Sequence, residues 1–92
     1  MTTPEEAAAL VIARDARFAG AQPFNPEVIG ASKWWTSEPL TDGGYRITLV
    51  VGWGDCMAGC INKHTWLHDV KPDGTVTLVS EEGDPVPAAL PN

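Results

Sequence analysis

The fold is decided by the stretch YRITLVVGW, residues 45–53. Apolar side chains occupy every second position, which is the period of a strand with one buried face and one face towards water. Such a strand needs neighbours to pair with and a second layer of structure to cover its apolar face. The set predicted to share this buried face consists of Tyr45, Ile47, Leu49, Val51 and Trp53.

A helix is predicted ahead of this strand, over residues 4–19. Thr3 is a favourable N-cap residue, Pro4 suits the first helical turn, and Glu6 completes a capping box. An alanine-rich run follows, and Gly20 supplies a stop signal. Because the apolar residues recur near one face, we expect this helix to pack on a sheet.

Three further strands flank the central one, over residues 28–37, 61–70 and 75–80. A connector at 21–28, turn signals between the strands and a proline-containing tail at 83–92 separate the elements. Consecutive strands joined by hairpins form a meander. The sequence therefore predicts an α+β fold in one domain, residues 1–92, with one N-terminal helix packed on a four-stranded antiparallel β-meander.

The register between residues 45–53 and 61–70 stays open between two alternatives. A one-residue bulge in the glycine-rich connection would align Ile47, Leu49, Val51 and Trp53 on one face with the set Val70, His68, Trp66 and His64. Without the bulge, Leu67 would lie on that face and both histidines on the other. The bulged register is favoured because it groups more apolar area.

The chain is acidic, with six Lys and Arg against 12 Asp and Glu and a net charge of −6. No basic stripe is present, which disfavours binding to nucleic acid, and no apolar run is long enough for membrane insertion. The N-terminal residues do not read as an export signal. A close cysteine pair in a small acidic domain nevertheless favours an extracellular or periplasmic protein whose signal has been removed, the alternative being a cytoplasmic one.

Both cysteines lie in the stretch GWGDCMAGC, residues 52–60. Cys56 and Cys60 can meet in a disulfide if the chain turns back on itself, as the glycines allow. The alternative is a zinc or copper site that uses Cys56, Cys60, His64 and His68. On an extended strand the two histidines would be about 13 Å apart, too far to share one ion. The disulfide is therefore preferred, and no cofactor is expected.

Exposed tryptophans are the candidate contact residues, because tryptophan is enriched in the hot spots of protein interfaces. Trp34 and Trp35 are adjacent, so in a strand one of them must point away from the core. The predicted binding surface combines that outward indole with residues of the tip: Trp53, Asp55 and Met57.

Three segments carry a resemblance to a known family: EEAA at 5–8, YRITL at 45–49 and WLHDVKPDGTV at 66–76. Together they resemble the small PepSY and cystatin-like modules of exported bacterial proteins. The resemblance implies a helix followed by a curved antiparallel meander. The Gln-x-Val-x-Gly inhibitory loop of cystatins has no counterpart here, and the cysteine-containing tip is not part of the family pattern.

These features predict a non-enzymatic binding or inhibitory module that presents a disulfide-stapled hairpin tip to a protein partner. The rigid loop would lose little entropy on docking. Two alternatives remain: the metal-binding protein described above, and a small hydrolase-like enzyme. The enzyme would use His64 or His68 as general base, supported by Asp55 or Asp69.

Overall fold

The computed structural model describes residues 3–25, 33–53 and 62–85. It contains one α-helix, one short 3-10 helix and a five-stranded sheet whose strands follow one another in the order β1-β2-β3-β4-β5. The α+β class is confirmed. The predicted four antiparallel strands are corrected, because a fifth strand, β1, pairs in parallel with β2.

The helix α1 spans Pro4–Ile12 and is shorter than the predicted 4–19. Its start is as expected: the Thr3 hydroxyl accepts a hydrogen bond from the Glu6 N–H at 3.1 Å. The helix ends early because Asp15 adopts an extended backbone and caps a separate 3-10 helix, η1, Ala16–Phe18. Aspartate competes for nearby backbone N–H groups in this way and favours caps over helix interiors.

The strands are β1 Gln22–Pro23, β2 Lys33–Pro39, β3 Tyr45–Trp53, β4 Asn62–Val70 and β5 Val76–Gly83. β2 runs past the predicted end at 37, and β5 runs past the predicted end at 80 into what was expected to be tail. β1 lies in the predicted connector, where two residues are too few to show a strand period. The described part of the first predicted strand begins at residue 33.

The β3–β4 register groups the side chains as the favoured alternative predicts. Ile47 lies opposite His68, Leu49 opposite Trp66, and Val51 opposite His64, so all six share one face. The opposing pairs are displaced by two residues from the expected alignment, which placed Val70 across from Ile47. The predicted bulge falls at 54–61, outside the described residues.

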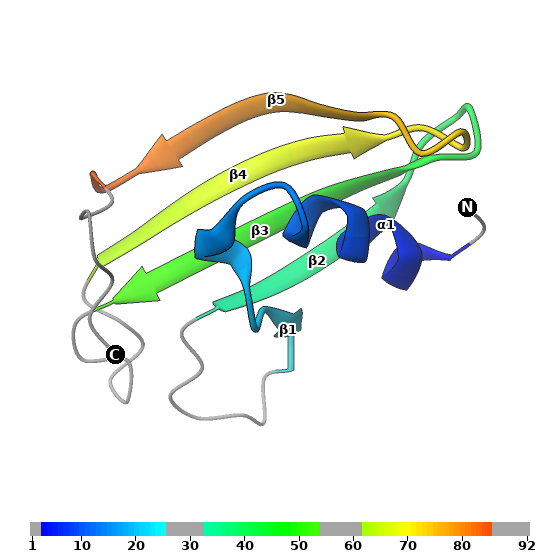
Figure 1. The fold of residues 1–92 in the computed structure, drawn as a ribbon. Helices are drawn as coiled ribbons and strands as arrows, with labels where there is room; N and C mark the ends of the chain where they lie inside the picture. Colours follow the sequence, from blue (N-terminus) through cyan, green and yellow to red (C-terminus); the bar gives the residue numbers. More distant parts are fainter. Residues whose placement is uncertain (1–2, 26–32, 54–61, 86–92) are drawn as a thin grey trace.

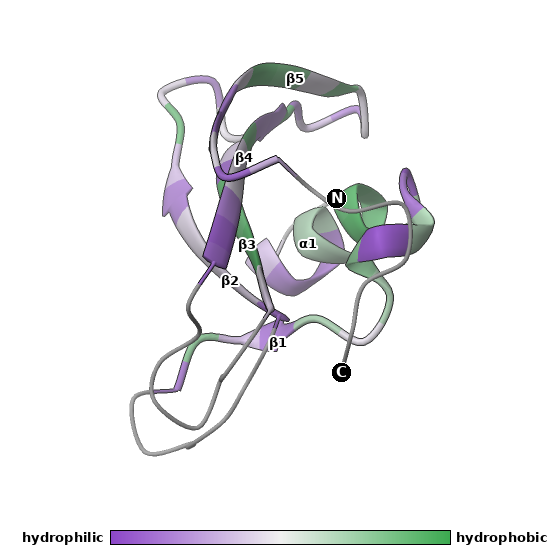
Figure 2. Cartoon of the chain, turned by 90° about the vertical axis from the view of Figure 1, so that its left-hand side faces the viewer, coloured by the Kyte–Doolittle hydropathy of each residue, from purple (hydrophilic) through white to green (hydrophobic). Residues whose placement is uncertain are grey.

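The helices cover one face of the sheet only (Figures 1 and 2). α1 packs against β2, β3 and β4, and β5 forms the far edge of the sheet beyond them. The core between the two layers is made by Ala7, Ala8, Val11, Phe18 and Ala21 from one side and by Trp35, Ile47, Leu49, Val51, Trp53, Trp66 and Val70 from the sheet. No helix among the described residues is long and apolar enough to span a membrane.

Candidate functional site

Trp34 and Trp35 lie on opposite faces of β2, as adjacent strand residues must. Trp35 points into the core and is 7% exposed. Its partner on β3 is the buried Leu49, whereas Trp34 lies opposite the half-buried Val50 on the uncovered face. Trp34 is therefore the outward indole of the pair, and it is half-buried.

Phe24 stands beside Trp34, with 6.5 Å between the two ring centroids. It is 53% exposed, the highest value among the exposed large apolar side chains of the described chain. The Phe24 N–H donates a hydrogen bond of 2.9 Å to the carbonyl oxygen of Trp35, which continues the parallel pairing of β1 with β2. Backbone pairing thus fixes the position of an aromatic side chain that the core does not use.

Lys63 completes this surface from two strands away. Its Nζ lies 5.9 Å from the centroid of the Trp34 ring, within the range of a cation–π contact. Between β2 and β4, the β3 residue opposite Lys63 is Gly52, which has no side chain to obstruct the lysine. We call Phe24, Trp34 and Lys63 the aromatic patch.

The aromatic patch lies at one particular end of the sheet. Trp53 and Asn62 are the last pair of β3 with β4, and Gly52 and Lys63 are the pair before it. β3 therefore ends, and β4 begins, next to the patch. Trp53 itself is 7% exposed and belongs to the core, so of the predicted contact residues in the sheet only Trp34 faces outward.

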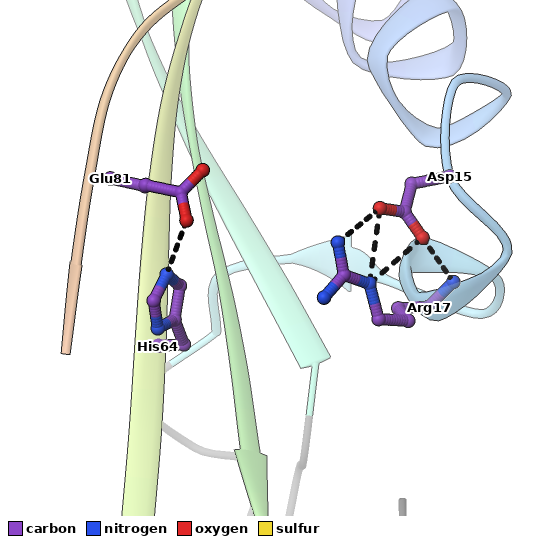
Figure 3. A network of polar contacts seen from close by, with 4 residues as sticks. All are labelled: Asp15, Arg17, His64 and Glu81. Carbon is purple, nitrogen blue, oxygen red and sulfur yellow. Dashed lines mark hydrogen bonds and ion pairs between the residues drawn. The ribbon is translucent and has the colours of Figure 1, made fainter. Parts of the chain in front are cut away.

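On the covered face, His64 joins β4 to the end of β5 (Figure 3). Its Nδ1 lies 2.8 Å from the carbonyl oxygen of Asp84, and its Nε2 lies 3.3 Å from Oε1 of Glu81. Both neighbours are acceptors, so a neutral imidazole can donate to only one of them and an imidazolium can donate to both. The carboxylate beside His64 thus comes from Glu81, and not from Asp69, one of the two carboxylates that the enzyme hypothesis names.

Trp66 fills the space next to His64 and leaves the ring little exposure. The His64 and Trp66 ring centroids are 4.5 Å apart, and Phe18 meets Trp66 edge-on at 4.9 Å. Arg17 lies over the Trp66 ring, with its Cζ 5.2 Å from the ring centroid. The Arg17 guanidinium also donates two parallel hydrogen bonds, from Nε and Nη2, to the two carboxylate oxygens of Asp15. The hydrogen bond from Arg17 lowers the pKa of Asp15. Trp66 is 3% exposed and acts as core.

His68 is a buried packing residue, 6% exposed, with its ring edge-on to Phe18 at 5.9 Å. Burial lowers its pKa, and the positive charge of Arg14 adds to the effect. Its buried Nδ1 has no hydrogen-bond partner within the described part of the chain. Asp69, the next residue, points to the opposite face.

Asp69 is held there by Arg46, whose Nε and Nη2 donate to its two carboxylate oxygens at 2.7 and 3.1 Å. The hydrogen bond from Arg46 lowers the pKa of Asp69. This pair occupies the uncovered face of the β3–β4 ladder. The structure therefore does not bring Asp69 together with either histidine.

Of the four proposed metal ligands, His64 and His68 lie among the described residues and Cys56 and Cys60 do not. Residues 3–25, 33–53 and 62–85 contain no group of three or more His, Cys, Asp or Glu side chains arranged to hold a metal ion. His64 and His68 are four residues apart on β4, about 13 Å along an extended strand. Cys56, Cys60, Asp55 and Met57 lie outside the described residues, so their predicted roles stay predictions.

Comparison of the chain with protein-family models, with curated proteins and with solved structures gives no match. The resemblance to PepSY and cystatin-like modules therefore stays a prediction. Three residues of the site were not predicted from the sequence. Phe24 lay in a segment predicted to be a connector, Lys63 carried no signal in the sequence, and Glu81 lay past the predicted end of the last strand at residue 80.

Proposed function

We propose that this chain is a non-enzymatic binding module that contacts a protein partner through the aromatic patch and the adjoining segment 54–61. The observation that carries the proposal is the pair of outward aromatic rings, Phe24 and Trp34, on a sheet face that no described helix covers. An aromatic ring that contributes nothing to the core but is held by backbone pairing is typical of a contact residue.

The chemistry of the patch suits a protein surface. Tryptophan and phenylalanine bring large, rigid contact areas, and tryptophan is among the residues that most often dominate binding energy. Lys63 adds a cation whose position over Trp34 is already set, so little side-chain entropy remains to be lost on docking. The remaining described residues of this face are mostly threonines and charged residues, which suit a polar rim.

The segment 54–61 enters the proposal through its composition. A disulfide between Cys56 and Cys60 would restrain Asp55 and Met57 next to the patch and would place the working environment outside the reducing cytosol. Mass spectrometry with a thiol alkylating reagent tests this part. Protein purified without reductant should gain two alkyl groups only after reduction, and alkylation of the untreated protein would contradict the disulfide.

The contact surface itself can be tested by selecting peptides from a random display library on the wild-type protein. Selected peptides should bind the double variant Phe24→Ser and Trp34→Ala at least about tenfold more weakly, since hot-spot residues contribute ~2 kcal/mol or more. A control variant, Leu10→Gln, removes a 38%-exposed apolar side chain from the other face and should bind the peptides as the wild type does. Equal binding to the double variant and the wild type would contradict the proposal.

A further inference from the structure

A second surface, independent of the aromatic patch, lies at the opposite edge of the sheet. β5 is the last strand in the order, and α1 makes its main sheet contacts with β2, β3 and β4 (Figure 1). No strand of residues 3–25, 33–53 or 62–85 lies beyond β5. Its eight residues span roughly 27 Å, and an edge strand of this kind offers unpaired N–H and C=O groups to another chain.

In addition to its unpaired backbone groups, the middle of β5 exposes apolar side chains. Leu78 is 48% exposed and Val79 is 47% exposed. The register to β4 shifts here: Leu67 lies opposite Ser80 and His68 opposite Leu78, so Val79 is the extra residue of a β-bulge. Leu78 lies opposite His68, on the helix side of the sheet, yet about half of its surface stays exposed.

The charged residues of β5 itself are all acidic, and the cations nearby include Arg17, which interacts with Glu81, and Lys71 in the turn before the strand. The strand contains Glu81 and Glu82 and no Lys or Arg, and Asp84 follows it. Glu82 pairs with Thr65 through its backbone, but its carboxylate makes no hydrogen bond or ion pair within the described part of the chain. A shallow cleft of about 460 Å³ lies between α1 and the β4–β5 turn, with an apolar floor flanked by two carboxylates; its lining is Glu6, Ala9, Leu10, Asp73 and Gly74.

These features discriminate between possible occupants of the edge. A second copy would bring its own Glu81 and Glu82 into the same ladder, and each chain carries a net charge of −6, so self-pairing is opposed by like charges. Pairing with a basic extended segment is instead favoured by charge, because the cations of the segment would face Glu81 on one side of the strand and Glu82 on the other.

We infer that β5 is a docking edge for an extended, basic segment of a partner protein, which adds to the sheet as a sixth strand. Main-chain hydrogen bonds supply the affinity of such strand addition, and alternate side chains supply the specificity. Side chains of the segment on the helix side lie beside Leu78 and the cleft, and those on the other side meet Glu82.

The probe is a terminally blocked hexapeptide that alternates valine and lysine, labelled for fluorescence polarisation. It should bind the wild-type protein at least about tenfold more tightly than the same peptide with glutamate in place of lysine. Glu82→Gln should weaken binding about 2- to 5-fold, the range of an exposed charge pair. The matched control Glu38→Gln removes the same charge from β2, three strands away from β5, and should leave binding unchanged.

A version of the lysine peptide with an N-methyl group at every residue keeps the charge but has no backbone N–H to donate to β5, and should not bind measurably. Equal affinity of the lysine and glutamate peptides, or retained binding of the methylated peptide, would overturn the inference. A dimer of the free protein that Glu82→Gln strengthens would also overturn it, because a second copy would then occupy the edge. These variants leave the aromatic patch intact, so either surface can fail without the other.

Discussion

Alanine substitution at Trp34 and at Trp35 should have very different effects on folding stability, although the two residues are identical and adjacent. Trp35 is 7% exposed and packs in the core cluster. Trp34 stands on the uncovered face, where its described ring and cation contacts are with Phe24 and Lys63. The comparison therefore holds chemistry and sequence position nearly constant and varies only the face of the sheet.

The magnitudes follow from these environments. Truncating a buried tryptophan to alanine costs about 3–5 kcal/mol, through lost burial and an incompletely filled cavity. A chain of 92 residues has a free energy of unfolding of roughly 5–14 kcal/mol. Trp35→Ala should therefore remove a large part of the total. Trp34→Ala loses one aromatic contact and one exposed cation–π contact, together about 1–2 kcal/mol.

Equilibrium unfolding in urea, followed by far-UV circular dichroism, measures both variants without relying on tryptophan fluorescence. With a slope of about 1–1.5 kcal/mol per molar urea, Trp35→Ala should lower the midpoint by about 2–5 M and Trp34→Ala by about 0.7–2 M. Equal losses at the two positions, or a larger loss at Trp34, would refute the assignment of the faces. The binding role of Trp34 would then have no structural basis.

Two further substitutions test the backbone and the buried histidine. A Cβ at Gly44 would lie 2.1 Å from the carbonyl oxygen of Val70, so Gly44→Ala should lower the free energy of unfolding by about 3 kcal/mol. Gly20→Ala, at φ +88° with open space around it, should lower the free energy of unfolding by about 1 kcal/mol. Equal losses of the two variants in urea melts would contradict the close approach at Gly44. Burial lowers the pKa of His68 in the folded protein, so the unfolded chain takes up the histidine proton first as the pH falls below about 6.5. The free energy of unfolding should therefore decline below that pH by at most about 1.4 kcal/mol per pH unit. His68→Leu should remove this part of the decline, and an unchanged pH dependence in the variant would contradict the reasoning.

The central strand and the helix start could be predicted from sequence because their signals are local. The alternation in residues 45–53 requires one buried face, and the Thr3 cap requires only its own helical turn. The end of the helix was missed because the Ala-rich run has high helix propensity. The break at Asp15 depends on a side-chain bond to the Arg17 N–H that competes with that propensity.

The extent of β5 and the position of β1 could not be predicted, because both depend on long-range pairing. Glu81, Glu82 and Gly83 have weak strand propensity, yet they pair with Trp66, Thr65 and His64. That pairing is also what brings Glu81 to the histidine. Short-range patterns around the histidines pointed instead to the sequence neighbour Asp69, which the alternation of β4 directs to the other face.

The choice between Trp34 and Trp35 shows where sequence reasoning ends for the site. Alternation states that one of them points outward but not which one. The β2–β3 register decides it, by placing Trp35 opposite the buried Leu49. Phe24 joins the patch through the parallel pairing of β1, which has no sequence signature of its own.

That Trp34 is a contact residue is tested most directly by isothermal titration calorimetry of one peptide selected on the wild-type protein, titrated into wild type and into Trp34→Ala. The variant should remain folded at 25 °C, and the dissociation constant should rise at least about tenfold, as expected for a tryptophan at the centre of an interface. An unchanged dissociation constant in the folded variant would contradict the proposed binding surface.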